Sequence, residues 1–164
     1  MDFALTEEQE MIRESAENFL ADVSTSAAVR EAMQTEQGYD QQVWQRICEE
    51  MVWPAIHIPE IYGGMGLGYV ELAVLLEKMG KYLLCSPYFS TVCLGVNALL
   101  MAGTEQQKAD YLPKIAEGQL TATLAYTGIN GRWDAHGVQA TYQKTTTGYL
   151  LNGQCRFVPD GHTA

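Results

Sequence analysis

The sequence contains few charged residues and lacks any apolar run close to the length of a membrane span. Charged side chains make up 18% of the 164 residues, and no run approaches the roughly 18 apolar residues of a transmembrane helix. The first ten residues, MDFALTEEQE, are acidic, whereas signal and transit peptides begin with basic residues. We therefore expect a cytoplasmic protein without a membrane segment or a targeting peptide.

Basic residues are scarce in the first third of the chain, and this part accounts for the whole net charge of −10. Residues 1–60 hold 13 acidic and 3 basic side chains, whereas residues 61–164 hold 7 of each. A surface of this sign repels a phosphate backbone, so nucleic-acid binding is not expected. The plainest interpretation is a solvated face that keeps the protein soluble.

The motifs that commonly mark a catalytic, nucleotide or metal site are missing. The four cysteines have no C-x-x-C spacing and the three histidines lie in separate segments, so no metal site is expected. The glycine-rich loop at residues 63–68 does not fit a dinucleotide-binding fingerprint, because Tyr69 occupies the last glycine position. No serine or cysteine has an identifiable base partner, which leaves acyl transfer by a side-chain nucleophile unsupported.

Apolar spacing and capping signals predict a helical bundle in the first part of the chain. The stretch between the first two helices is polar and loosely patterned, and the glycine-rich residues 55–68 should form a packed loop. The pairs Thr6/Gln9 and Thr104/Gln107 have the spacing of a capping box. Helices are expected over residues 6–23, from Asp40 to Pro54, and over 69–82, 87–102 and 104–117.

The composition changes after Gly118 to a segment rich in threonine, tyrosine and glycine, with apolar residues at a period near two. Strands are expected at residues 121–127, 138–145 and 148–158, with turn signals at 147–148 and 152–153. The fold class is therefore α+β, with a helical domain at 1–119 and an antiparallel β-domain at 120–164. About three strands leave open edges, so we expect this β-domain to be incomplete and the chain truncated.

Four blocks of the sequence resemble the acyl-CoA dehydrogenase family, in the family's order. They are FALTEEQEMIRESAENFL, IPEIYGGMGLGYVELAVLLEKMGK, GTEQQKADYLPKIAEGQ and GYLLNGQCRFVPDGHTA. The resemblance implies a helical amino-terminal domain, a middle β-domain and a helical carboxy-terminal domain that enclose FAD and an acyl-CoA. It also implies an electron-transfer flavoprotein as partner, and a homotetramer or heterotetramer.

The reaction that this resemblance implies is oxidation of the Cα–Cβ bond of an acyl-CoA to the 2-enoyl-CoA. A carboxylate removes the α-proton while hydride passes to flavin N5, and the base needs an enclosed, desolvated site. In the family this base comes from the carboxy-terminal domain, so we expect no catalytic base in residues 1–164 and no activity from this piece alone. The length and ring character of the acyl group are not readable from the sequence.

Five residues are expected to contact the cofactor by virtue of the resemblance. Tyr126 and Thr127 stand where the family's first β-strand meets the isoalloxazine ring, and Phe157 and Val158 stand where an aromatic and an aliphatic residue cover a flavin face. Pro159 occupies the place of a serine or threonine that hydrogen-bonds near flavin N5. Without the resemblance, these residues would be interpreted as ordinary strand residues of a β-core.

The sequence departs from the family at two places. The family usually continues after Thr127 with Glu-Pro-Gly-Ala-Gly-Ser-Asp, whereas this chain reads GINGRWD, which puts Arg132 and Trp133 near the expected flavin pyrophosphate and CoA. Pro159 offers neither a hydroxyl nor an N–H. These departures leave open an alternative, namely a non-catalytic structural subunit of a heteromeric dehydrogenase with a degenerate flavin site.

The acyl tail is expected to pass between the helices at 69–82 and 87–102. Ser90 and Leu94, one helical turn apart, are candidates to line its path, with Trp133 as a further candidate on the substrate side. The competing interpretation of Ser90 and Leu94 is ordinary core packing.

Overall fold

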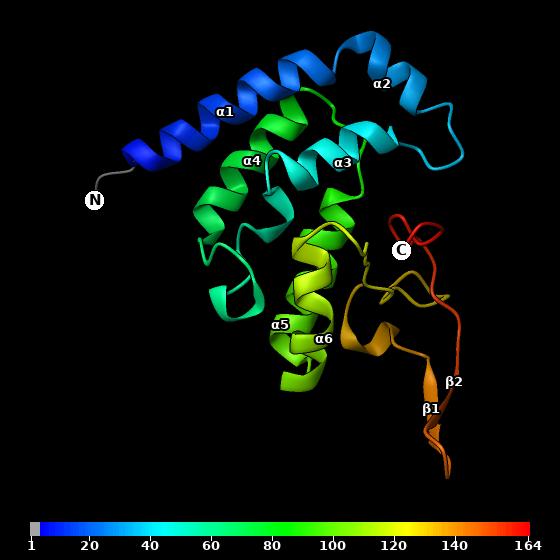
Figure 1. Cartoon of the computed structure of the whole chain (residues 1–164). Coiled ribbons are helices and arrows are strands. Elements are labelled where there is room, and N and C mark those ends of the chain that lie inside the picture. The colour runs from blue at the N-terminus through cyan, green and yellow to red at the C-terminus, as the bar shows by residue number, and fades with distance from the viewer. Residues whose placement is uncertain (1–3) are drawn as a thin grey trace.

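The computed structural model describes residues 4–164. Residues 1–3 lie outside this description. They belong to the acidic start of the chain, where we expect no targeting peptide. The described chain is rich in helix and carries one small antiparallel sheet, which confirms the α+β class (Figure 1). The elements are α1 (Glu7–Val23), α2 (Ser26–Ala32), α3 (Gln41–Glu49), α4 (Tyr69–Lys81), the π-helix (Phe89–Val96), α5 (Asn97–Ala102), α6 (Glu105–Ala116), β1 (Thr141–Lys144) and β2 (Tyr149–Asn152).

Both predicted capping boxes are present and set the starts of α1 and α6. Thr6 Oγ1 accepts a hydrogen bond from Gln9 N at 3.2 Å, and Gln9 Oε1 accepts one from Thr6 N at 3.0 Å. Thr104 and Gln107 repeat the arrangement at 3.2 and 2.9 Å. Each box satisfies two backbone donors that a helix start leaves without partners.

The helical region differs from the prediction around α2 and at the end of α3. The polar stretch after α1 forms the short helix α2, which Thr25 caps by accepting from Ala28 N at 3.2 Å. Helix α3 ends at Glu49 and does not continue to Pro54, because Val52 adopts a left-handed conformation with φ 53°. A 3-10 turn at Trp53–Ala55 contains Pro54 near its start.

The single helix expected at residues 87–102 is divided into the π-helix and α5. π-Helical turns are uncommon and frequently occur at functional sites. The π-helix is buried on both sides, with Ser90, Thr91, Val92, Gly95 and Val96 all inaccessible or nearly so. Its position between the other helices and residues 120–164 makes it the central element of the structure.

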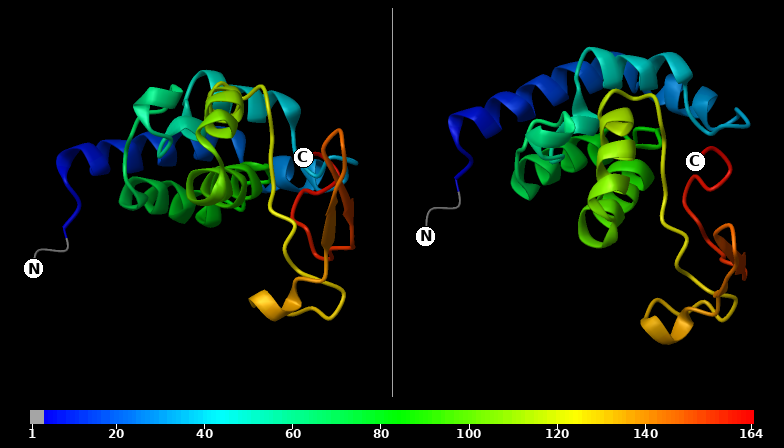
Figure 2. Two further views of the ribbon diagram at one scale, coloured as in Figure 1. Left: turned by 90° about the horizontal axis from the view of Figure 1, so that it is seen from below. Right: turned by 60° about the horizontal axis from the view of Figure 1, so that its bottom comes forward.

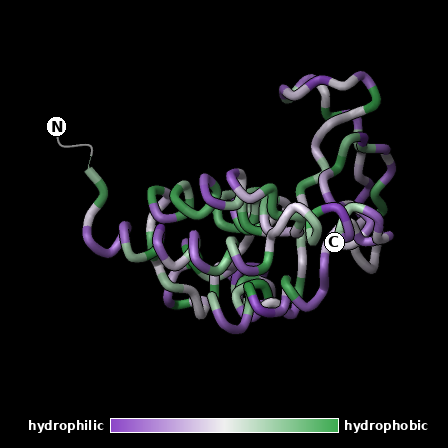
Figure 3. The backbone as a smooth tube through the Cα atoms, turned by 90° about the horizontal axis from the view of Figure 1, so that it is seen from above, coloured by the Kyte–Doolittle hydropathy of each residue, from purple (hydrophilic) through white to green (hydrophobic). Residues whose placement is uncertain are grey.

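The core is divided between two clusters of apolar side chains. The first joins α1, α3, α4 and the π-helix, and its edge-to-face pair Phe19–Trp53 has ring centroids 5.3 Å apart. The second lies under α6 and contains Ile58, Leu112 and Ile115. Hydrophobic and hydrophilic residues alternate along the helices (Figure 3), and α1, α3, α4 and α6 each bury one stripe. No helix in residues 4–164 is both long enough and apolar enough to span a bilayer.

The β-region is smaller than predicted. Strands β1 and β2 pair antiparallel with Thr141 opposite Asn152, and all eight of their residues are exposed. The turn signal at 147–148 lies in the hairpin, whereas β2 ends at the signal at 152–153. Residues 121–127 are extended but form no strand, because their hydrogen bonds go to side chains and to a distant loop. Figure 2 shows that residues 120–164 lie along one side of the helices.

The glycine-rich loop is packed, as predicted, through a backbone ladder onto residues 55–58. Met65 N donates to Ala55 O and Gly66 N to Ile58 O, each at 2.9 Å. A Cβ added at Gly64 would lie 1.9 Å from Ile58 O, a distance that no packing adjustment of side chains can relieve. Gly64 is therefore required by a close backbone approach.

We expect Gly64→Ala to destabilise the protein by about 3 kcal/mol or more, because the new methyl group forces the loop away from Ile58. The matched control is Gly80→Ala in α4, where a Cβ would meet nothing within 4 Å. This control should raise stability by up to about 1 kcal/mol through helix propensity. Urea unfolding followed by circular dichroism measures both changes. Equal stability of the two variants would contradict the packing argument.

Candidate flavin and substrate site

Two segments about 30 residues apart in the sequence run side by side at the edge of the helices. The Arg156 N–H donates to Thr127 O at 2.8 Å, and Thr123 Oγ1 donates to Pro159 O at 2.8 Å. Further along, the Cys155 thiol lies 3.4 Å from Ala125 O. We call residues 121–127 together with 155–160 the junction. The five residues predicted to contact the cofactor all belong to it.

The junction residues differ in exposure. Thr127 is buried, Tyr126, Val158 and Pro159 are half-buried, and Phe157 has 79% of its surface exposed. Phe157 also has a left-handed backbone with φ 54°, an uncommon conformation for an aromatic residue. This conformation presents the Phe157 ring to solvent at the edge of the junction. Flat exposed rings of this kind provide a surface on which an aromatic ligand can stack.

The divergent loop GINGRWD is held by its own hydrogen bonds. Gly131 N donates to Gly128 O at 3.0 Å, which closes a turn. The Arg132 guanidinium binds the Asp134 carboxylate through Nε at 3.1 Å and Nη2 at 2.6 Å, so the Arg132 side chain lowers the pKa of Asp134. Trp133 packs edge-to-face on Tyr126 at 5.9 Å and remains 76% exposed.

The two predicted acyl-lining residues of the π-helix have different surroundings. Ser90 is fully buried, with Oγ 2.6 Å from Oδ2 of Asp160 and 3.0 Å from the carbonyl oxygen of Pro87. Leu94 is half-buried. Contact of Ser90, Leu94 or Trp133 with an acyl group stays a prediction. The Ser90–Asp160 hydrogen bond was not predicted, because its partners lie 70 residues apart.

Residues 6–119 match the family described as acyl-CoA dehydrogenase, N-terminal domain. The chain belongs to the acyl-CoA dehydrogenase family. It is 34% identical to acyl-CoA dehydrogenase IpdE2 of Mycolicibacterium smegmatis, over 77% of this chain and 40% of that protein. The chain spans about two fifths of the length of such curated relatives.

Solved structures share the fold of this chain. An acyl-CoA dehydrogenase from Bacillus anthracis complexed with FAD is 26% identical with a TM-score of 0.81, over 94% of this chain and 27% of that one. The ChsE4-ChsE5 complex of Mycobacterium tuberculosis is 25% identical with a TM-score of 0.79, over 93% of this chain and 40% of that one. These similarities confirm the resemblance that the four sequence blocks indicated.

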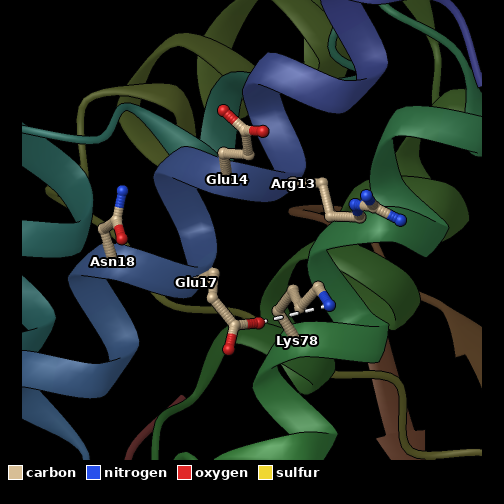
Figure 4. Close-up of a pocket in the computed structure, with 5 residues that line it drawn as sticks. All are labelled: Arg13, Glu14, Glu17, Asn18 and Lys78. Atoms are coloured by element: carbon tan, nitrogen blue, oxygen red, sulfur yellow. Dashed lines mark ion pairs between the residues drawn. The ribbon is translucent and has the colours of Figure 1, made fainter.

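A pocket lined by charged residues lies between α1 and α4 (Figure 4). The carboxylate of Glu17 in α1 forms an ion pair with the Lys78 ammonium at 3.2 Å and a second one with Lys81. It also accepts a hydrogen bond from the Tyr82 hydroxyl at 2.6 Å. Hydrogen bonds from the Lys81 ammonium, the larger effect, and from the Tyr82 hydroxyl lower the pKa of Glu17 from 4.5 to about 2. Because Glu17 is fully engaged with α4, its carboxylate is a contact between the two helices.

The buried histidine, His57, is a neutral core residue. Asn97 Nδ2 donates to Cys93 O at 2.9 Å, so its Oδ1 accepts from the Tyr69 hydroxyl at 2.8 Å and faces His57 Nε2 at 3.3 Å. His57 Nε2 therefore carries the proton, while buried Nδ1 has no partner. Burial lowers the pKa of His57. Residues 4–164 contain no cluster of side chains suited to a metal ion.

The Glu17 contacts predict how acid affects stability. The folded-state pKa of Glu17, about 2, lies below its ordinary value of 4.5. The unfolded chain therefore binds more protons in this range, and the stabilisation from Glu17 is present above pH 4.5 and is lost as the pH falls toward 2. Unfolding midpoints measured from pH 6 to about pH 2 should fall less steeply for Glu17→Gln than for the wild type.

The matched control for this measurement is Glu14→Gln. Glu14 lines the same pocket one turn earlier on α1 and forms no ion pair with α4 in the described chain. Its variant should reproduce the wild-type fall in stability with acid. The same flattening in both variants would show that net charge, and not the Glu17 contacts, sets the acid response.

Proposed function

We propose that the full-length protein is an FAD-dependent acyl-CoA dehydrogenase that converts an acyl-CoA to the 2-enoyl-CoA. Family membership supports the reaction class. The observation that carries the proposal is the junction, where the Arg156–Thr127 hydrogen bond of 2.8 Å joins the two segments predicted to contact the cofactor. Residues 1–119 would form the substrate-side helical domain, and residues 120–164 the start of the flavin-binding domain.

The junction residues fit one face of a flavin. Phe157 and Tyr126 offer aromatic surface and Val158 offers an apolar side chain, which suits a planar, partly apolar ring. FAD, which is present in the similar Bacillus anthracis structure, supplies a hydride acceptor. Pro159 has no N–H, and its carbonyl oxygen already accepts from Thr123. Hydrogen bonds to the ring would therefore come from other backbone groups.

The substrate would lie between α4 and the π-helix, with Leu94, Ser90 and Trp133 on its path. We assign no catalytic base within residues 1–164, because the carboxylates in the junction and in the adjoining GINGRWD loop are engaged: Asp160 binds Ser90 and Asp134 binds Arg132. We further propose an electron-transfer flavoprotein as the oxidant of the reduced flavin, and a homotetrameric or heterotetrameric assembly. The heteromeric ChsE4-ChsE5 complex, to which the chain is similar, supports the heteromeric form.

A second candidate function is a non-catalytic subunit of a heteromeric acyl-CoA dehydrogenase. Two observations favour it over an ordinary dehydrogenase site. Pro159 cannot donate a hydrogen bond, and the bidentate pairing with Asp134 neutralises Arg132, which would otherwise attract a phosphate. In this case the protein would support the fold of a partner subunit and would not hold flavin.

Purification of the full-length protein distinguishes these two functions. A dehydrogenase should be yellow, contain about one FAD per chain, and reduce an electron acceptor when an acyl-CoA is added. Phe157→Ala should weaken FAD binding about tenfold, because it removes an aromatic surface from the ring. Titration of the apo-protein with FAD, followed by flavin fluorescence, measures this change.

Tyr149→Ala is the matched control, since Tyr149 is an exposed aromatic residue of β2 outside the junction. It should bind FAD as tightly as the wild type. A colourless full-length protein that is active only with a second subunit would contradict the dehydrogenase proposal and support the structural subunit.

A further inference from the structure

The loop that carries Phe157, Val158 and Pro159 has an uncommon backbone. Phe157 and Asp160 both adopt left-handed conformations, with φ values of 54° and 50°. Such conformations are unfavourable for residues other than glycine and persist where surrounding contacts hold them. The segment after Pro159 must therefore be fixed by interactions outside itself.

Asp160 organises the end of this loop through its backbone. Its carbonyl oxygen accepts from Thr163 N at 3.0 Å and from Ala164 N at 3.1 Å, and Gly161 N donates to Val158 O at 3.2 Å. These hydrogen bonds close a compact turn over residues 158–164. They are local, so they fix the shape of the turn without fixing its place on the protein.

The side chain of Asp160 supplies the attachment to the helical domain. Its Oδ2 accepts from Ser90 Oγ at 2.6 Å, and Ser90 lies fully buried in the π-helix. The pKa of Tyr39, which precedes α3, is raised mainly by burial and to a smaller extent by the negative charge of Asp160. The carboxylate thus binds the π-helix and is close enough to Tyr39 to act on its titration.

Threonine side chains attach the same loop to the extended segment of the junction. Thr123 Oγ1 donates to Pro159 O, and Thr121 Oγ1 donates to Thr163 O, each at 2.8 Å. These two hydrogen bonds hold the two segments of the junction together, but neither bond reaches a helix. Within residues 4–164, the hydrogen bond from a side chain of the helical domain to this loop is the one that Ser90 donates.

We infer that the Ser90–Asp160 hydrogen bond is a positioning contact that holds the Phe157–Pro159 loop at a fixed place beside the substrate-side helices. Ser90 and Asp160 would then set where the flavin face lies relative to the acyl group, although neither needs to touch the reacting atoms. The link to the flavin rests on the proposed function. Anchoring of the loop itself does not, and the two can be measured separately.

The experiment uses the full-length protein and the variants Ser90→Ala, Asp160→Ala and Asp160→Asn. Hydrogen exchange reads the anchoring, because the amides of Gly161, Thr163 and Ala164 lie in the turn. Ser90→Ala and Asp160→Ala should speed their exchange about tenfold. They should also weaken FAD binding about tenfold and shift the flavin absorption spectrum, since a charge-assisted hydrogen bond has been lost.

Asp160→Asn is the conservative variant, because its amide oxygen can still accept from Ser90 and asparagine tolerates a left-handed backbone. It should retain slow exchange and a nearly wild-type flavin spectrum. Ser15→Ala, on the exposed surface of α1, is the control for loss of a serine hydroxyl and should change neither readout. If Ser90→Ala fails to fold, Asp160→Gly, which accepts the left-handed backbone but lacks the carboxylate, is compared with Asp160→Asn and still decides the question.

The outcomes separate this inference from the proposed function. Unchanged amide exchange in Ser90→Ala and Asp160→Ala would overturn the anchoring role. Faster exchange with an unchanged flavin spectrum and FAD affinity would overturn the positioning role and leave the dehydrogenase proposal intact. A full-length wild-type protein that binds no FAD would overturn the dehydrogenase proposal together with the flavin-positioning role, while exchange would still report on the anchor.

Discussion

The close contact between the π-helix and Ala122 determines how residues 120–164 lie on the helices. A Cβ added at Gly95 would lie 2.6 Å from the Cβ of Ala122, and Thr91 Oγ1 accepts from Ala122 N at 3.2 Å. The chain therefore leaves α6 and lies directly against a buried helix. This contact sets the position of residues 121–127, to which Arg156 and Thr123 join the second segment of the junction. The Ser90–Asp160 hydrogen bond attaches the end of that second segment to the same helix.

Much of the fold follows from local signals in the sequence, because those signals act over three or four residues. The capping box at Thr6 and Gln9 needs only its own backbone to form, so the start of α1 was predictable. The π-helix was not predictable, since apolar periodicity does not separate it from an α-helix. The strand expected at 121–127 was wrong for a related reason: an extended pattern forms a strand only where another strand pairs with it, and here Thr91 is the partner of Ala122.

The resemblance named the residues expected at the candidate site, and their contact with a flavin stays a prediction; the sequence did not indicate their geometry. The family resemblance indicated Thr127 and Phe157, and the structure brings their segments together. The burial of Thr127 and the left-handed backbone of Phe157 depend on contacts that no local pattern encodes. Asp160 was missed because its hydrogen-bond partner, Ser90, is distant in sequence. The only local signal is the Asp160-Gly161 pair, which is typical of a turn.

The departures from the family sequence form a consistent local structure. In the loop GINGRWD, a Cβ at Gly128 would lie 2.1 Å from Gly137 O, so the loop closes tightly on the turn that Asp134 caps. Pro159 removes a donor, but it also restricts Val158 to extended conformations and reduces the freedom of the unfolded loop. Because the carbonyl of Pro159 is bound by Thr123, the proline stiffens a segment that is already held. The changed sequence therefore replaces side-chain hydrogen bonding with backbone rigidity beside the expected flavin face, which is compatible with an ordered site.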